Sequence, residues 1–220
     1  MTTFAFIHGA GDVGWYWHLV EAELRARGHD TVAPDLPVED DTAGLDRYAD
    51  VVIEAIGDRQ DVVVVGQSFG GYVAPLVGDR IGARLIVLVA GMVPKTGETA
   101  DEMFRNTEWK PARLDDSSTI AVFYHDVRPE LAEQAVDHER RQSDTPSSES
   151  WPLAAWPDIP TRAIIGRDDR FFPAAWLRTV IRDRLGIAPD EIDSGHCPAW
   201  SRPQELAELL TGYVATGTRR

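Results

Sequence analysis

The sequence predicts an α/β fold in which a mostly parallel sheet is covered by helices on both faces. Two observations lead to this prediction. Short apolar runs alternate along the chain with longer segments whose apolar residues recur at helical spacing. The apolar runs are also continuous, without interleaved polar residues, which is typical of strands buried on both faces. Strands and helices that alternate in this way indicate parallel strands joined by crossover helices.

Six segments have the composition of buried strands. They are residues 4–8, 31–33, 62–65, 85–89, 162–165 and, from a weaker pattern, 191–192. Helical spacing of apolar residues is clearest over 45–56, 176–181 and 206–214. The last helix is preceded by Ser201-Arg202-Pro203-Gln204, which predicts a capping box with proline in the first turn.

Residues 93–160 interrupt the alternation. They contain helix-like pieces at 100–106 and 129–142 and a polar stretch at 143–150, but no buried strand pattern. A long excursion of this kind within a compact domain is usually an active-site lid or an added subdomain. We therefore expect one domain over residues 1–220, with a lid inserted at about 93–160. Its aromatic residues are expected mainly in its own core, with Trp156 and Phe123 as candidate substrate contacts.

The composition limits the kinds of partner. The chain has 220 residues and a net charge of −14 at pH 7, which argues against nucleic acid or an anionic membrane, because both attract a basic surface. Cys197 is the only cysteine, so neither an intrachain disulfide nor a cysteine-rich metal site is expected. Neither a signal-peptide pattern nor a membrane-spanning apolar stretch occurs. We expect a cytoplasmic protein without metal or cofactor, and a homodimer is left open.

Residues 66–70 read Gly-Gln-Ser-Phe-Gly and directly follow four valines at 62–65. A buried strand that reverses sharply into a helix would place Ser68 at the apex, and Gly66 and Gly70 remove the Cβ atoms that would clash there. The hydroxyl would then lie at a helix N-terminus, where backbone N–H groups favour developing negative charge. The pattern predicts a nucleophilic serine, and a purely structural glycine-rich turn is the alternative.

A serine nucleophile requires an adjacent base, usually a histidine that a carboxylate orients. His196 fits because it lies between the last strand and the last helix, and open α/β sheets bind ligands beyond the carboxyl ends of their strands. Asp168 and Asp169 both follow the strand at 162–165, and either could supply the carboxylate. The remaining candidates are expected to be structural or solvent-exposed: Asp35, Asp126, His18, His29, His125 and His138.

Residues 6–11, Phe-Ile-His-Gly-Ala-Gly, end the first strand and predict an oxyanion hole. A glycine-rich loop at this place can direct the backbone N–H of Ala10 toward the serine, beside the N–H of Phe69, which follows the nucleophile. A single donor of this kind typically contributes ~10²–10³ in turnover. Phosphate binding is the alternative use of such glycines, and it is disfavoured because no P-loop Gly-Lys-Ser/Thr is present.

With these residues together, the chain resembles the α/β-hydrolases, and more narrowly their small methylesterase/hydroxynitrile lyase branch. The triad order serine, aspartate, histidine is the order of that superfamily. The family's acid commonly stands in a Gly-x-x-Asp-x-x-x-Pro pattern, which Gly166, Asp169 and Pro173 match, so the resemblance favours Asp169 over Asp168. The motifs that carry the resemblance are His8-Gly9-Ala10 with Gly14-Trp15-Tyr16-Trp17, Pro34-Asp35-Leu36-Pro37, Gly66-Gln67-Ser68-Phe69-Gly70-Gly71, and Ser194-Gly195-His196.

Two departures from the family pattern refine what the resemblance implies. The family's usual N-terminal hairpin has no match, so we expect about six strands. The lyases carry a lysine directly after the histidine, where this chain has Cys197, and this favours ester hydrolysis over cyanohydrin cleavage. The resemblance thus implies a cofactor-independent serine hydrolase that cleaves a small, largely apolar carboxylic ester or lactone through an acyl-enzyme.

Other functions remain open on the same scaffold. A carbon–carbon bond hydrolase or lyase and a cofactorless peroxidase use the same fold, and fold does not determine function. A non-catalytic small-molecule receptor is the alternative from a different class. Such a receptor is expected to lose at least one triad member, whereas this chain keeps Ser68, Asp169 and His196.

Overall fold

Residues 1–215 of the chain are described by the computed structural model, and their six strands form one parallel sheet in the order β2-β1-β3-β4-β5-β6. Each strand overlaps one predicted from the sequence, so the predicted α/β fold with about six strands is confirmed. The strands are β1 (Thr3–Ile7), β2 (Asp30–Val32), β3 (Val62–Gln67), β4 (Leu85–Val89), β5 (Thr161–Gly166) and β6 (Asp190–Ile192).

The valine run in β3 shows why the sheet is covered on both faces. Val62 and Val64 pack into one apolar core, and Val63 and Val65 pack into the other. Successive side chains of a strand point to opposite faces, so a strand between two cores requires apolar residues at every position. β3 pairs with β1 on one side, with Phe6 opposite Val65, and with β4 on the other.

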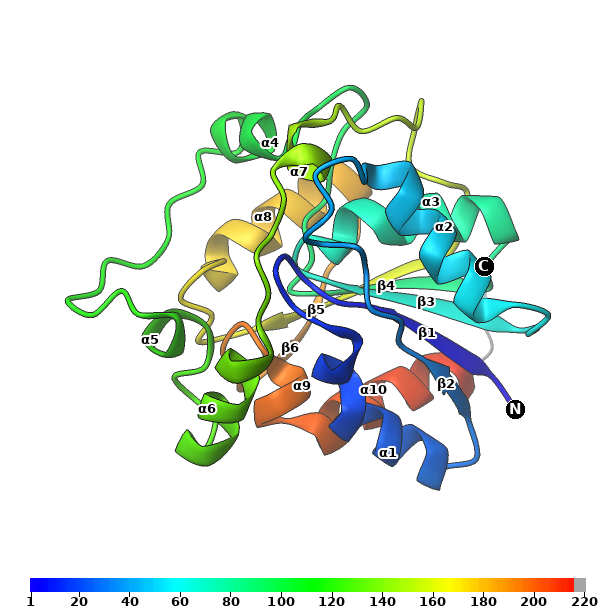
Figure 1. Ribbon diagram of the computed structural model, residues 1–220, viewed down its shortest axis with the longest axis horizontal. Coiled ribbons are helices and arrows are strands. Elements are labelled where there is room, and N and C mark those ends of the chain that lie inside the picture. The colour runs from blue at the N-terminus through cyan, green and yellow to red at the C-terminus, as the bar shows by residue number, and fades with distance from the viewer. Residues whose placement is uncertain (216–220) are drawn as a thin grey trace.

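Helices cover the two faces in separate layers (Figure 1). Each helix turns its apolar stripe to the sheet, as in α2, where Tyr48, Ala49, Val52 and Ile56 are buried. One layer contains α2 (Leu45–Ile56), α3 (Gly70–Ile81) and α8 (Ala174–Leu185). The other contains the 3₁₀ helix η1 (Gly14–Trp17), α1 (His18–Ala26), α9 (Pro198–Ser201) and α10 (Pro203–Ala215). No helix within residues 1–215 combines the length and apolar character needed to cross a membrane.

The start of the last helix differs from the prediction. α10 begins at Pro203, and Ser201 closes the short α9. The Ser201 N–H lies 3.3 Å from the Cys197 carbonyl oxygen, and its buried Oγ has no hydrogen-bond partner within residues 1–215. The predicted capping box is therefore wrong, because Ser201 belongs to the preceding helical turn instead of the extended position that a capping residue needs.

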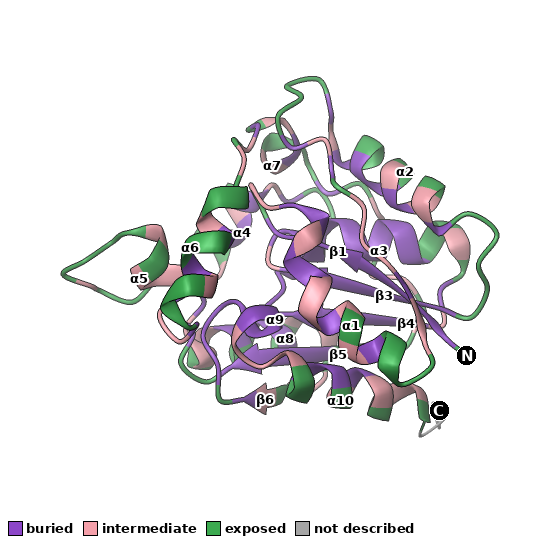
Figure 2. Cartoon of the chain, turned by 60° about the horizontal axis from the view of Figure 1, so that its bottom comes forward, coloured by how far each residue is buried: buried purple, intermediate pink, exposed green. Residues whose placement is uncertain are grey.

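The excursion, residues 93–160, contains four helices and no strand. α4 (Ala100–Asn106) has the predicted bounds, whereas α6 (Pro129–His138) ends four residues before the predicted end at 142. The other two helices are α5 (Thr119–Phe123) and α7 (Thr145–Ser148). Between α4 and α5 the chain forms a mostly exposed tip, residues 110–118, which extends far from the sheet (Figures 1 and 2).

Candidate active site

Ser68 lies in a sharp turn between β3 and α3. Its φ is 50°, a left-handed conformation that is unusual for a residue with a side chain. Backbone hydrogen bonds fix the turn, since the Ser68 N–H donates to the Val89 carbonyl (3.2 Å) and its own carbonyl accepts from Met92 (2.9 Å). A Cβ on Gly66 would lie 2.5 Å from the Gly70 carbonyl oxygen, so only glycine fits there. The sequence folds locally as the elbow pattern predicts.

His196 and Asp169 form a buried hydrogen-bonded pair at the carboxyl ends of β6 and β5. The Nδ1 of His196 lies 2.8 Å from Asp169 Oδ2. The other carboxylate oxygen accepts the N–H groups of Phe171 (2.9 Å) and Phe172 (2.8 Å). Three hydrogen bonds therefore hold a carboxylate that is 6% exposed, and this arrangement meets the requirement that a buried charge be paired. Asp168, in contrast, is exposed.

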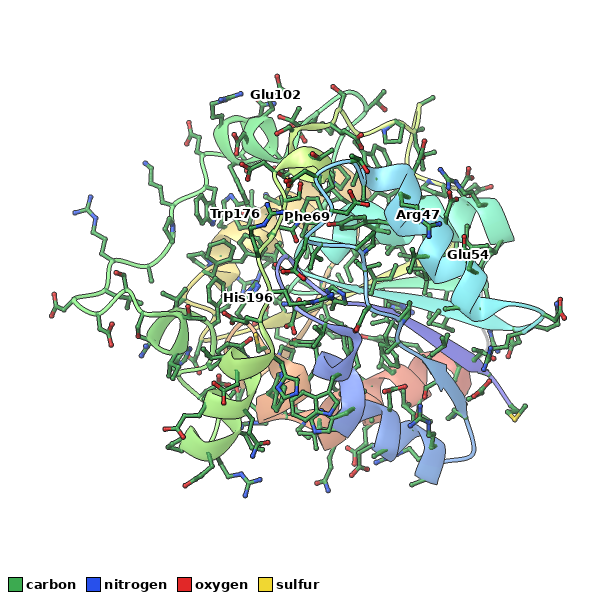
Figure 3. The ribbon with its side chains drawn as sticks, viewed as in Figure 1. Arg47, Glu54, Phe69, Glu102, Trp176 and His196 are labelled. Carbon is green, nitrogen blue, oxygen red and sulfur yellow. The ribbon has the colours of Figure 1, made fainter. Side chains whose placement is uncertain are left out.

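The environment of His196 determines which nitrogen can act. Asp169 accepts the Nδ1 proton, which leaves Nε2 as the acceptor. The rings of Phe123, Phe171 and Phe172 meet the imidazole at centroid distances of 5.3, 5.3 and 5.1 Å and enclose it in apolar surface. Within residues 1–215 no hydrogen bond joins His196 to Ser68, but both side chains line the same cavity. Figure 3 shows His196 and Phe69 in the middle of the molecule, whereas Glu102 lies at its edge.

Two backbone donors are available beside Ser68. Within the described residues, neither the Ala10 N–H nor the Phe69 N–H donates a hydrogen bond. Ala10 lines the cavity with Ser68, and the Phe69 ring packs into the core against Tyr72. A free N–H at the cavity wall, on Ala10, and a second on the residue that follows Ser68 are the kind of donors that an oxyanion hole uses.

His8 stabilises the loop that carries Ala10. Its Nδ1 lies 2.8 Å from the Gly9 carbonyl oxygen, and its Nε2 accepts the Leu36 N–H at 3.1 Å. Burial lowers the pKa of His8 to about 4, so the ring is neutral near pH 7, with its proton on Nδ1. The sequence analysis did not assign this role, although the His-Gly-Ala motif places the residue correctly for it. Asp35, expected to be structural, accepts the Gly14 N–H at 2.7 Å in the same loop system.

The loop at 9–14 also reads Gly-Ala-Gly-Asp-Val-Gly, which has the spacing of a dinucleotide-binding turn. Two features disfavour a pyrophosphate here. The Gly14 N–H is already used by Asp35, and the Asp12 carboxyl group lines the cavity beside the loop. When ionised, this carboxyl group would repel a phosphate.

The cavity shared by Ser68 and His196 has a volume of about 300 Å³. Phe123 lines it, whereas Trp156 lines a different cavity, packs on Trp151 and donates its indole N–H to Thr161 Oγ1 (3.0 Å). Trp156, predicted as a substrate contact, is thus not among the residues that line the cavity of Ser68 and His196. Trp156 precedes β5, and Asp169 follows it, so the two residues lie beyond opposite ends of a six-residue strand.

A polar wall of the same cavity was missed by the sequence analysis. It consists of Asp12, Tyr124, Glu139 and Arg140. Burial raises the pKa of Asp12 to about 7 and also raises that of Glu139. The Arg140 guanidinium donates through Nη2 to the carbonyls of Asp12 (3.3 Å) and Leu36 (3.2 Å). Glu139 and Arg140 reach the cavity because α6 ends at His138, and no sequence pattern indicated that end.

Two of the histidines that were set aside have packing roles. His18 and His138 both stack on the ring of Trp15, and their ring centroids lie 4.1 and 4.0 Å from its centroid. This contact joins α6 of the excursion to η1. In the described part of the chain, no group of three or more His, Cys, Asp or Glu side chains could hold a metal ion.

Comparisons with known proteins agree with this architecture. Residues 4–209 match the family model described as "Alpha/beta hydrolase family". The "Probable esterase PIR7A" of Oryza sativa subsp. indica is 31% identical, and the alignment covers 96% of each chain. "Methylesterase 7" of Arabidopsis thaliana is 26% identical, with 94% of each chain covered. The solved structure of polyneuridine aldehyde esterase has a TM-score of 0.82 at 20% identity and covers 97% of this chain and 99% of its own.

Proposed function

This chain belongs to the alpha/beta hydrolase family, in its esterase-type branch, and we propose that it hydrolyses a small carboxylic ester or lactone through an acyl-enzyme without a cofactor. The observation that carries the proposal is the buried His196–Asp169 pair, because His196 of this pair lines one cavity with the serine of the elbow. A histidine that a carboxylate orients, in the same cavity as a serine, is the arrangement that activates the hydroxyl.

In the first half of the reaction, Ser68 Oγ attacks the carbonyl carbon while His196 Nε2 takes its proton. Asp169 keeps the imidazole in the tautomer with Nδ1 protonated and stabilises the imidazolium that forms. The N–H groups of Ala10 and Phe69 bind the tetrahedral oxyanion, each contributing ~10²–10³ in turnover. The intermediate collapses, His196 protonates the departing alkoxide, and an acyl-Ser68 ester remains.

In the second half, His196 takes a proton from water, and the resulting nucleophile attacks the acyl-enzyme. Collapse of this intermediate returns the proton to Ser68 Oγ and releases the carboxylic acid. With a lactone, the alcohol stays attached to the acyl group, and the product is a hydroxy acid.

The excursion acts as a lid in this proposal. Phe123 of α5 contacts the edge of His196 and lines the cavity. Trp109 donates its indole N–H to the Phe171 carbonyl (2.9 Å) and is half-buried. The lid thus packs on the loop that carries Asp169, and its apolar side chains would exclude water from the acyl-enzyme.

The test combines a covalent probe with a turnover screen. A fluorophosphonate should add once per chain, on Ser68, and p-nitrophenyl esters of graded length beside a panel of lactones should identify the substrate class. Ser68→Ala should abolish both labelling and turnover, while Ser201→Ala, outside the cavity, should retain them. Labelling of another serine, or hydrolysis that persists in Ser68→Ala, would overturn the mechanism.

A further inference from the structure

Two adjacent lid residues contact both loops that carry the proposed acid and base. Asp126 accepts the Gly195 N–H through Oδ2 at 2.7 Å. His125 Nε2 lies 3.0 Å from the Asp168 carbonyl oxygen. Each contact falls on the residue that directly precedes a member of the triad. Elements far apart in the sequence are thus joined where the imidazole and the carboxylate must be aligned.

Neighbouring contacts reinforce this connection. Arg170, which follows Asp169, donates through Nη1 to the Ala121 carbonyl at 2.7 Å. Phe123 meets the ring of Phe171 at a centroid distance of 4.9 Å as well as that of His196. Residues 121–126 of the lid therefore contact the acid loop and the base loop through hydrogen bonds and aromatic packing.

The packing around Gly195 shows how close this approach is. A Cβ on Gly195 would lie 2.7 Å from Asp126 Oδ1 and 2.8 Å from His125 Nε2, so a larger residue would push the lid away from the histidine loop. Asp126 Oδ1 is buried and has no hydrogen-bond partner among the described residues. An unpaired carboxylate oxygen is unfavourable for stability, which favours a functional reason for an aspartate here.

We propose that Asp126 is a positioning residue for the hydrolase reaction: its carboxylate fixes the Gly195 peptide so that His196 stands between Asp169 and Ser68. His125 supports the acid loop in the same way. The inference rests on the proposed function, since it concerns the alignment of that triad. It also means that the lid completes the catalytic arrangement in addition to covering the cavity.

The test compares Asp126→Ala with Asp126→Asn, which keeps an oxygen acceptor, and uses Asp137→Ala as the control, because Asp137 is an exposed aspartate on α6 of the same lid. With p-nitrophenyl acetate, Asp126→Ala should lower kcat by about 10–100-fold with KM within about twofold, since a small misplacement of a catalytic group has effects of this size. The rate of fluorophosphonate labelling should fall by the same factor. Asp126→Asn should recover most of the loss, and Asp137→Ala should match the parent.

A second measurement does not depend on activity. Amide hydrogen exchange of the peptide around Gly195 should be faster in Asp126→Ala and parental in Asp126→Asn. Parental kcat and exchange in Asp126→Ala would overturn the inference, as would an Asp126→Asn variant as impaired as the alanine variant. If the parental enzyme itself lacks Ser68 labelling, the proposed function fails, while the exchange result still decides whether Asp126 holds the loop.

Discussion

The carboxyl ends of the strands and the excursion contribute to one cavity in different ways. The strand ends place Ser68 and Asp169 through local backbone geometry: a left-handed turn holds the serine, and the N–H groups of the next residues hold the carboxylate. The excursion acts through distant contacts, such as Asp126 with Gly195, 69 residues apart, and Arg140 with Asp12, 128 residues apart. The proposed reactive groups thus belong to the region with local patterns, and on our proposals their alignment and surroundings depend on the other region.

The largest expected effect comes from a substitution that changes only a strand-end residue. Asp169→Asn should lower kcat by ~10⁴, because the asparagine stabilises neither the required tautomer nor the imidazolium. Asp168→Asn should change kcat less than about threefold, since that side chain is exposed and its backbone carbonyl is retained. Steady-state kinetics on one p-nitrophenyl ester measure both variants. The reverse order of effects would move the acid to Asp168.

His8 tests whether the oxyanion loop depends on a neutral ring. The pKa of His8 is lowered from 6.5 to about 4 in the folded protein, so its contribution to stability is present above pH 6.5 and is lost as the pH falls toward 4. His8→Asn removes this titration. Between pH 7 and pH 4.5 the variant should lose about 2–3 kcal/mol less free energy of unfolding than the parent. Urea unfolding at the two pH values provides the measurement, and parallel losses would refute the prediction.

Asp12, in the polar wall, is expected to change the stability with pH in the direction opposite to His8. Its pKa is raised from 3.8 to about 7, so the folded protein keeps a proton there and loses this stability as the pH rises from about 4 through 7. Asp12→Asn should therefore be more stable than the parent by about 2 kcal/mol at pH 8.5 and nearly equal at pH 4. Thermal unfolding midpoints across this range measure the difference. The exposed Asp137→Asn serves as the control and should show no such trend.

The smallest expected effect is a difference in KM between substitutions of two aromatic residues of the excursion. Phe123→Ala should raise KM for a bulky ester by about 5–10-fold, because it removes an apolar contact made equally before and in the transition state. Trp156→Ala should leave KM at the parental value, since that ring lies in another cavity. Both should still label at Ser68. Equal KM changes in the two variants would show that the excursion acts only through its overall packing.

The sequence was sufficient where a pattern reflects geometry within a few residues. The valine run, the elbow and the strand-end loops of Asp169 and His196 all have local causes, although the choice between Asp168 and Asp169 also required a family pattern. The approximate positions of the strands could also be predicted, because each apolar run is a local pattern. The fold class and the positions of Ser68, Asp169 and His196 at the strand ends could therefore be predicted.

The rest could not be predicted because it depends on contacts across the chain. Trp156 was predicted at the site because it lies a few residues before the strand that leads to Asp169, but that strand separates the two residues. The polar wall depends on Glu139, which leaves the helix in an extended conformation with φ −60° and ψ 145°. Asp126 was interpreted as structural, since nothing near it in sequence indicates its contact with Gly195.

The exposed tip at 110–118 has a consequence for how the enzyme can be divided. A cut there would leave the proposed nucleophile and both proposed oxyanion donors on one piece, and the proposed acid, the proposed base and Asp126 on the other. The two pieces would still share the β4–β5 ladder, with Ile86 opposite Thr161 and Val89 opposite Ile164. Neither half alone could turn over an ester, so restored hydrolysis would report that two separately expressed fragments, or two proteins fused to them, have come together.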